Sequence, residues 1–290
     1  MTTAKIVVFG ANGNIGSQVV SALIDRNVAV RAVVRSEEKG AALKAAGAEL
    51  AVADVSQPNT LAAALEGAQR VFLLMAFVPD QVTPVTNVVE AAKAAGVETI
   101  VKLSAFGADP SAPLAIAQQH GKADQIVEKS GLGYTILRPT FFQDNLLNFH
   151  AHTIQEQGVF YGASHGGAAP HVSSRDIAEV GAAILTAPER HDGKTYVLTG
   201  PQALTDAQVA NIASKALERK VEYVDIPGEK MAESMRSQGA PDWMVESLVG
   251  LENVKAQGWA EEVTPVVSDI LGRPGETYES FLMRHRSRLA

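Results

Sequence analysis

Three glycines near the start of the chain have the spacing of a phosphate-binding turn. Gly10, Gly13 and Gly16 form a GxxGxxG pattern between an apolar, β-branched run at 5–9 and a stretch with helical spacing at 14–26. Gly10 permits a sharp strand-to-helix turn, Gly13 leaves room for a pyrophosphate, and Gly16 lets the helix pack on the strand. Free N–H groups at a helix start then attract phosphate. This context favours a dinucleotide site over a purely structural turn, with contacts at Gly10, Asn12, Gly13, Asn14, Ile15 and Gly16.

The end of the second predicted strand indicates which dinucleotide binds. NAD-binding proteins carry a carboxylate about 20 positions after the glycines to hold the ribose hydroxyls. Here Arg35 lies 19 positions after Gly16, and no carboxylate occupies the strand end. A guanidinium can pair with a 2′-phosphate, and Ser36 and Lys39 can add hydrogen bonds or charge. Arg31 lies on the same side of the strand and can assist. The pattern predicts NADP(H), with NAD(H) less favoured, unless Arg35 is merely a solvated surface residue.

Further cofactor contacts are expected where other parallel strands end, because ligands of this fold bind at the carboxyl ends of the strands. Asp54 is a candidate neighbour of the adenine, although a helix-capping role is equally open. Met75 is also a candidate cofactor contact, and the alternative is that it simply packs in the core. Phe141 and Phe142 either cover the nicotinamide or pack two domains together. The complete set of these strand-end candidates is Asp54, Val55, Leu74, Met75, Ala76, Ser104, Ala105, Pro139 and Phe141.

A common proton-donor pair is missing from the sequence. Short-chain dehydrogenases use Tyr-x-x-x-Lys, and no tyrosine of this chain has a lysine four positions later. A localised alkoxide needs an acid nearby, whereas a conjugated acceptor can take its proton from water. The absence therefore favours conjugated acceptors. Two candidate catalytic residues remain at the helix after the fifth strand: Lys122, which can also bond the nicotinamide ribose, and His120, which can donate a proton near neutral pH. Both have a plain helix-surface role as the alternative.

Composition excludes several other classes of protein. The chain has no cysteine, which excludes disulfides, thiolate catalysis and cysteine-based metal sites. No metal site is expected, because His150 and His152 stand two apart in a helical stretch and point away from each other. The formal charge of −7 argues against nucleic acid as the main partner. No membrane span or signal peptide is evident, so we expect a cytoplasmic protein with a small-molecule substrate, either a monomer or a homodimer.

Strands alternate with helices along the first two-thirds of the chain. This alternation predicts an α/β fold, a doubly wound parallel sheet of the NAD(P)-binding Rossmann type. Strands are expected at 5–9, 28–34, 49–53, 71–75, 99–103, 134–137 and 195–198, and helices at 14–26, 37–46, 60–66, 82–95, 115–129 and 174–186. Residues 1–200 are predicted to form the Rossmann domain, with 155–172 contributing cleft loops. Residues 201–290 are predicted to form a small, mainly helical lid domain.

Four segments resemble a known family. GANGNIG, VRAVVRSEEK, VKLSAFGAD and GLGYTILRPTFFQDNLL are similar to the NmrA-like atypical short-chain dehydrogenase/reductases, in particular the NAD(P)H:quinone oxidoreductase and triphenylmethane reductase type. The resemblance covers about residues 4–225. It implies a Rossmann domain with a small C-terminal domain and NADP(H) as the usual ligand. Such families include reductases of quinones and dyes and also redox sensors that bind the cofactor without turnover.

The leading hypothesis is therefore an NADPH-dependent oxidoreductase that transfers hydride to a quinone-like or other conjugated acceptor. The alternative is a non-catalytic NADP(H)-binding redox sensor of the NmrA type. A third hypothesis is a biosynthetic reductase of imines or enones.

Overall fold

A computed structural model describes residues 5–289 of the chain. The chain forms two compact units and passes between them three times. The first unit runs to Pro139 and resumes over Ile177–Val197, and the second comprises Thr140–Asp176 and the chain from Leu198 onwards. Each unit is described by itself.

A seven-stranded sheet forms the centre of the first unit. Its order is β3-β2-β1-β4-β5-β6-β9, and neighbouring strands from β3 to β6 pair in parallel register. The strand order reverses between β1 and β4, which is the place where open α/β sheets bind their ligands. The strands are β1 Ile6–Val8, β2 Val30–Val34, β3 Glu49–Val52, β4 Arg70–Leu73, β5 Thr99–Leu103, β6 Gly133–Pro139 and β9 Lys194–Leu198.

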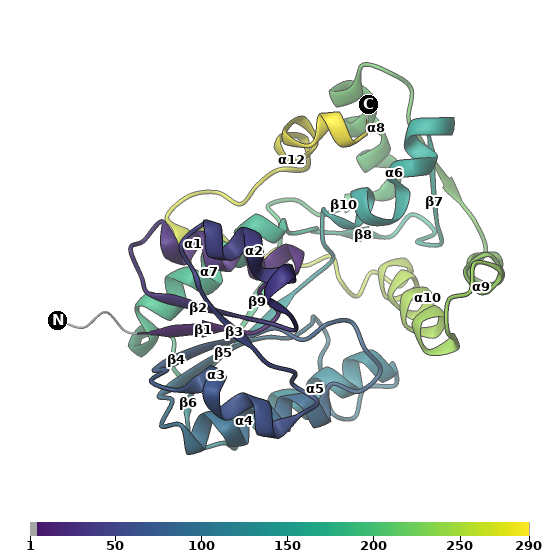
Figure 1. The fold of residues 1–290 in the computed structure, drawn as a ribbon. Helices are drawn as coiled ribbons and strands as arrows, with labels where there is room; N and C mark the ends of the chain where they lie inside the picture. Colours follow the sequence, from purple (N-terminus) through teal and green to yellow (C-terminus); the bar gives the residue numbers. More distant parts are fainter. Residues whose placement is uncertain (1–4, 290) are drawn as a thin grey trace. The chain divides into compact units, whose positions relative to one another are not determined.

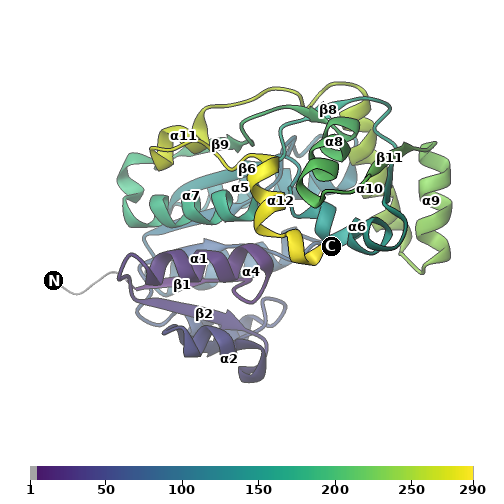
Figure 2. The same ribbon diagram turned by 90° about the horizontal axis from the view of Figure 1, so that it is seen from above.

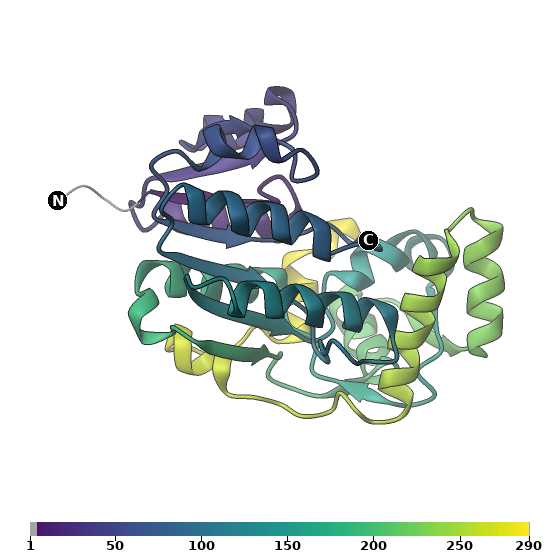
Figure 3. The ribbon, with the colours of Figure 1, turned by 90° about the horizontal axis from the view of Figure 1, so that it is seen from below.

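Helices cover both faces of this sheet. One face carries α1 (Asn14–Ile24), α2 (Glu37–Ala45) and α7 (Ser174–Thr186), as Figures 1 and 2 show. The opposite face carries α3 (Leu61–Leu65), α4 (Val82–Ala94) and α5 (Ala115–Glu128), with α4 and α5 side by side in Figure 3. Buried apolar residues of β1, β4 and β5 pack against α3 and α4 in one core. Strands covered on both faces need such near-continuous apolar runs.

The second unit is mainly helical. Its core joins α6, β7, α8 and α12 through residues such as Leu147, Phe160, Ala213 and Phe281. Two small sheets accompany these helices, the parallel pair β7–β11 and the antiparallel pair β8–β10. The elements are α6 Asn145–Gln157, β7 Val159–Gly162, β8 Ala168–Ala169, β10 Leu204–Thr205, α8 Asp206–Leu217, β11 Glu222–Asp225, α9 Gly228–Ser237, α10 Asp242–Ala256, α11 Val266–Leu271 and α12 Tyr278–Arg284. Short 3-10 turns lie at Pro58–Thr60, Pro188–Arg190 and Arg286–Arg288.

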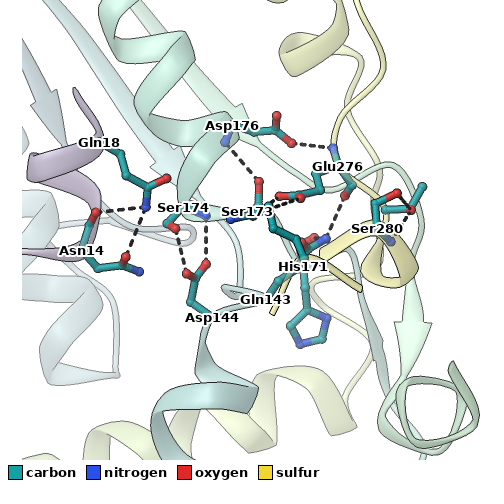
Figure 4. A network of polar contacts seen from close by, with 12 residues as sticks. Asn14, Gln18, Gln143, Asp144, His171, Ser173, Ser174, Asp176, Glu276 and Ser280 are labelled. Atoms are coloured by element: carbon teal, nitrogen blue, oxygen red, sulfur yellow. Dashed lines mark hydrogen bonds and ion pairs between the residues drawn. The ribbon is translucent and has the colours of Figure 1, made fainter. Parts of the chain in front are cut away.

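A polar network ties the beginning of α6 and α7 to the segment before α12 within the second unit (Figure 4). The Asp144 carboxylate accepts hydrogen bonds from the backbone N–H and hydroxyl of Ser174 at 2.9 and 2.8 Å. The Asp176 carboxylate accepts a hydrogen bond from the backbone N–H of Glu276 at 2.6 Å. The Gln143 side-chain amide donates a hydrogen bond to the Glu276 carbonyl at 2.8 Å. These buried bonds fix the loop that follows β6.

The predicted fold class is confirmed, and most predicted elements are found within one or two residues of their expected ends. One segment lies outside the unit it was expected in: residues 140–176 group with the second unit, although residues 1–200 are predicted to form the Rossmann domain. Among the described residues, none of the helices has the length and apolar character needed to cross a membrane.

Candidate dinucleotide site

The three glycines take different positions in the turn between β1 and α1. Gly10 has a φ of +71°, which side-chain-bearing residues rarely adopt, and a Cβ there would lie 2.7 Å from the Leu74 carbonyl oxygen. At Gly16 a Cβ would lie 2.1 Å from the Gly10 carbonyl oxygen, so α1 packs directly on the turn. At Gly13 such a Cβ would lie 3.3 Å from the Gly10 carbonyl oxygen. A Cβ at Gly13 would therefore make a tight contact with one backbone oxygen, whereas at Gly10 and Gly16 it would overlap backbone atoms.

The beginning of α1 has the electrostatic character of an anion site. Gly13 is its N-cap and supplies no side-chain hydrogen bond, and the first turn contains no acidic residue. The positive end of the helix dipole is thus not neutralised by a carboxylate of the first turn. Gly13 and Asn14 are exposed, while Ile15 and Gly16 are buried. An exposed helix start with no side-chain cap and no acidic residue in its first turn fits a pyrophosphate.

Arg35 and Asp54 face the same region from the ends of β2 and β3. Arg35 is exposed, and its positive charge contributes to lowering the pKa of Asp54. The larger cause is the backbone N–H of Ser56, which bonds Asp54 Oδ1 at 2.9 Å, followed by the Ser56 hydroxyl at 2.7 Å. These bonds to Ser56 close a turn after β3, and Asp54 is not the N-cap residue of the 3-10 turn or of α3, which begin after Gln57 and Thr60; its role beside the adenine remains a prediction. Ser36 and Lys39 lie at the start of α2, where Ser36 is the N-cap residue without a side-chain cap bond.

Arg31 does not assist Arg35, contrary to the prediction. Its side chain is buried, and its guanidinium bonds Glu49 and the carbonyls of Ala64 and Glu66, each at 2.8 Å. Arg31 lies near the start of β2, whereas Arg35 follows its end. Strict alternation puts both on one side of a strand, but a separation of four residues spans roughly 13 Å along it. The guanidinium of Arg31 therefore links β2 to β3 and the end of α3.

The remaining strand-end candidates of the first unit line the edge at which β4, β5 and β6 end. Leu74 and Met75 are half-buried, Ala76 is exposed, and Met75 packs on the core cluster, which was its alternative role. Ser104 and Pro139 are buried, and Ala105 is half-buried. Val55 is half-buried, and its backbone carbonyl accepts a hydrogen bond from the Asn87 side-chain amide at 2.9 Å. Leu74 lies directly against the glycine turn, since its carbonyl oxygen would be 2.7 Å from a Cβ at Gly10; cofactor contacts by the other residues of this set remain predictions.

Phe141 belongs to the second unit. Its ring lies 5.7 Å from that of His171, and the Lys255 ammonium lies 5.3 Å from its centroid. Lys255 is itself paired with Asp206 at 3.0 Å and Glu252 at 2.9 Å. The proposed role of Phe141 at the nicotinamide remains a prediction.

His120 and Lys122 differ sharply in environment. Lys122 is exposed, and its ammonium bonds the Gln118 side chain at 2.8 Å. Burial, reinforced by the charge of Lys102, lowers the pKa of His120 to about 4. This lowered pKa favours a neutral imidazole at pH 7, and the catalytic role of His120 remains a prediction. Any contribution of His120 must come from a neutral hydrogen-bonding ring.

Two features of this region were not anticipated from the sequence. Lys102, the penultimate residue of β5, is buried and pairs with Asp124 of α5 at 2.7 Å. Asp124 also forms an ion pair with Arg138 of β6 at 2.9 Å. The signal for this cluster was present, because a lysine inside an apolar strand must find an anion. Gln81 is also buried, and its amide donates to the carbonyls of Ala76 and Val78 at 2.9 and 3.3 Å, which fixes the loop after β4.

The sheet order, the glycine turn and the uncapped start of α1 define a dinucleotide-binding protein of the Rossmann class. A model of the NmrA-like family matches residues 2–272, and the chain belongs to that family. The chain is 37% identical over 280 residues to the NAD(P)H azoreductase of Xenophilus azovorans, covering 97% of each protein.

Two solved structures extend this comparison. The NADPH-dependent quinone oxidoreductase of Escherichia coli, crystallised with NADPH, is 29% identical with a TM-score of 0.87, covering 96% of this chain and 99% of that one. The triphenylmethane reductase of Citrobacter sp., complexed with NADP(H), is 25% identical with a TM-score of 0.85, covering 97% of this chain and 99% of that one.

Proposed function

We propose that this protein is an NADPH-dependent reductase of quinone-like or other conjugated small molecules. The observation that carries the proposal is the turn of Gly10, Gly13 and Gly16 at the uncapped start of α1, with Arg35 at the end of β2. The family and the reductase names of its relatives support the same function and favour it over a non-catalytic redox sensor. A cytoplasmic location, a monomeric or homodimeric state and a lid role for residues 201–290 remain predictions.

In such a reductase, different site residues bind different parts of the cofactor. Bound NADPH supplies the hydride. The turn from Gly10 to Gly16 holds the pyrophosphate, and Arg35 with Ser36 and Lys39 holds the 2′-phosphate. Residues at the ends of β4 and β5, with Lys122, contact the ribose and nicotinamide. The chain orients both reactants and excludes water, which is the protein's share of hydride transfer.

The direct test is an assay of the purified protein with NADPH and a panel of quinones and cationic dyes. We expect loss of NADPH absorbance that depends on the acceptor and exceeds the rate without protein. Tight NADPH binding without turnover of any acceptor would instead favour the redox sensor.

Cofactor preference gives the first specific prediction. NADPH should bind at least about tenfold more tightly than NADH, because a guanidinium–phosphate pair contributes more than about 1.4 kcal/mol. Arg35→Ala should weaken the binding of NADPH by roughly ten- to fiftyfold and change the affinity for NADH by less than about threefold. Calorimetric titration of both cofactors measures this. Lys44→Ala, which removes a cation from the last turn of α2, is the control and should change neither affinity. Equal affinities of the unmodified protein for the two cofactors would contradict the assignment of Arg35.

A further inference from the structure

Three buried polar atoms of the first unit have no hydrogen-bond partner among the residues that the structure describes: Arg70 Nε, Ser104 Oγ and His120 Nδ1. Arg70 begins β4, and its guanidinium bonds the Leu185 carbonyl through Nη1 at 2.6 Å, whereas Ser104 Oγ and His120 Nδ1 are found together at the other end of the strands. Ser104 is only 6% exposed. Buried polar groups are nearly always paired, and leaving one unpaired costs about 1–3 kcal/mol. Two such atoms together therefore need an explanation, and a ligand that supplies the missing bonds is one.

The register of β5 and α5 places these two residues at the same level. The helix connects the end of β5 to the start of the parallel strand β6, so it runs in the opposite direction to both strands. Lys102 and Asp124 are in contact at 2.7 Å. Ser104 lies two residues beyond Lys102, roughly 6.6 Å further along the strand on the same face. His120 lies one turn before Asp124, about 6 Å in the same direction on the same helix face. Ser104 and His120 are therefore neighbours at the carboxyl edge of the sheet.

The backbone beside them is held rigidly. Ser104 N–H donates to the Leu137 carbonyl at 2.7 Å, which continues the pairing of β5 with β6 beyond Leu103. A Cβ at Gly121, next to His120, would lie 2.2 Å from the Asp109 carbonyl carbon, so α5 packs directly on the loop after β5. The Gln119 side chain accepts the Gln81 N–H at 3.3 Å, which links the same turn of α5 to the loop after β4. Such fixed surroundings suit a binding site, since the groups need little rearrangement.

The charges that face His120 come from three elements. Lys102 of β5 opposes protonation of the imidazole, while Asp124, on the same helix, favours it. Arg138 of β6 neutralises the second oxygen of Asp124 through bonds of 3.1 and 2.9 Å. Two cations thus share one carboxylate beneath the ring, and the imidazole remains a neutral group.

We propose that Ser104 and His120 together hydrogen-bond the oxygen or nitrogen of the acceptor on which negative charge develops, and that Lys102, Asp124 and Arg138 position them. The inference rests on the proposed reductase function. A quinone that accepts a hydride gains two electrons and one proton, and the resulting anion takes a second proton from solvent. Two fixed donors stabilise this anion without giving up a proton. The pair performs the binding task for which the missing Tyr-x-x-x-Lys would otherwise be needed.

The test compares Ser104→Ala, His120→Leu and the double variant with the unmodified protein. Each single change should lower kcat/KM for a quinone by about 10- to 100-fold, and His120→Leu should leave the NADPH dissociation constant within about twofold. The dissociation constant of a non-reducible quinone analogue, measured in the presence of NADP+, should rise in both variants. The double variant should lose clearly less than the product of the single effects, because both groups bond one atom. Ser130→Ala, in the turn that follows the C-terminal end of α5, is the matched control and should change none of these values.

The outcomes separate this inference from the proposed function. If the unmodified protein reduces no acceptor, the reductase proposal fails. If it reduces quinones and both single variants keep their acceptor affinity and rate, only the Ser104–His120 site is wrong. Multiplicative single effects would also overturn it, because they would mean two separate sites.

A variant of Lys102 tests the positioning role by a different measurement. Lys102→Met retains the Asp124–Arg138 pair, so the protein is expected to fold. Removal of the ammonium should raise the pKa of His120 from about 4 towards its ordinary range, as followed by NMR of the imidazole protons. The acid limb of the pH–rate profile should move upward with it. An unchanged imidazole titration would overturn the positioning role of Lys102.

Discussion

Gly13→Ala is expected to abolish useful NADPH binding while the protein still folds. The added methyl group meets the Gly10 carbonyl oxygen at 3.3 Å, a tight contact that a shift of a few tenths of an ångström relieves, and Gly13 has a φ of −79°, which alanine adopts freely. It projects into the space that the pyrophosphate needs above the start of α1. Loss of two charge-assisted hydrogen bonds at about 1.4 kcal/mol each weakens binding on the order of 100-fold. Calorimetry with NADPH gives the affinity, and thermal unfolding should show a midpoint within a few degrees of the unmodified protein.

Two further glycine variants make this prediction specific. Gly16→Ala would put a methyl carbon 2.1 Å from the Gly10 carbonyl oxygen, so α1 must shift and stability should fall by about 1–3 kcal/mol or more. Gly228→Ala meets Val249 at 3.3 Å, the same tightness as at Gly13, but lies in the second unit at the start of α9. It should bind NADPH normally. If Gly13→Ala also binds NADPH normally, the glycine turn is not the pyrophosphate site.

Local patterns predicted the first unit well because its elements depend on short-range rules. The near-continuous apolar runs of β1, β2 and β5 require cover on both faces, and they were found close to their expected ends. The glycine turn could be predicted because steric rules assign each of its glycines a task. Helix α7 begins and ends where its apolar spacing predicted, at Ser174 and Thr186.

Features that depend on distant contacts could not be predicted in the same way. Arg31 and Arg35 are alike in sequence pattern, yet Glu49 and the end of α3 bind the first and leave the second exposed. The pKa of His120 depends on burial and on Lys102, which is 18 residues earlier in the chain. Residues 140–176 group with the second unit through partners such as Glu276 and Tyr278, and no local periodicity encodes that choice.

The buried charges beneath His120 lead to the second large prediction. Asp124→Ala should lower the free energy of unfolding by about 3–5 kcal/mol, because it leaves the Lys102 ammonium buried without an anion. Burial already lowers the pKa of Lys102, so its charged form is costly in this position even with Asp124 present. Arg138 is 25% exposed and can turn towards water, whereas Lys102 is 1% exposed and cannot. Urea unfolding at neutral pH measures the loss.

A rescue experiment separates loss of charge pairing from loss of packing. The double variant Lys102→Met/Asp124→Leu replaces the buried pair with apolar groups and should recover most of the stability, since such replacements are often neutral or stabilising. Glu90→Ala breaks the exposed Glu90–Lys93 pair of α4 and should change stability by less than about 0.5 kcal/mol. If the double variant is as unstable as Asp124→Ala, the carboxylate acts through its packing on α5 and not as the counter-ion of Lys102. Recovery of stability without recovery of quinone reduction would mean that the ion cluster serves the site above it and is not required for folding.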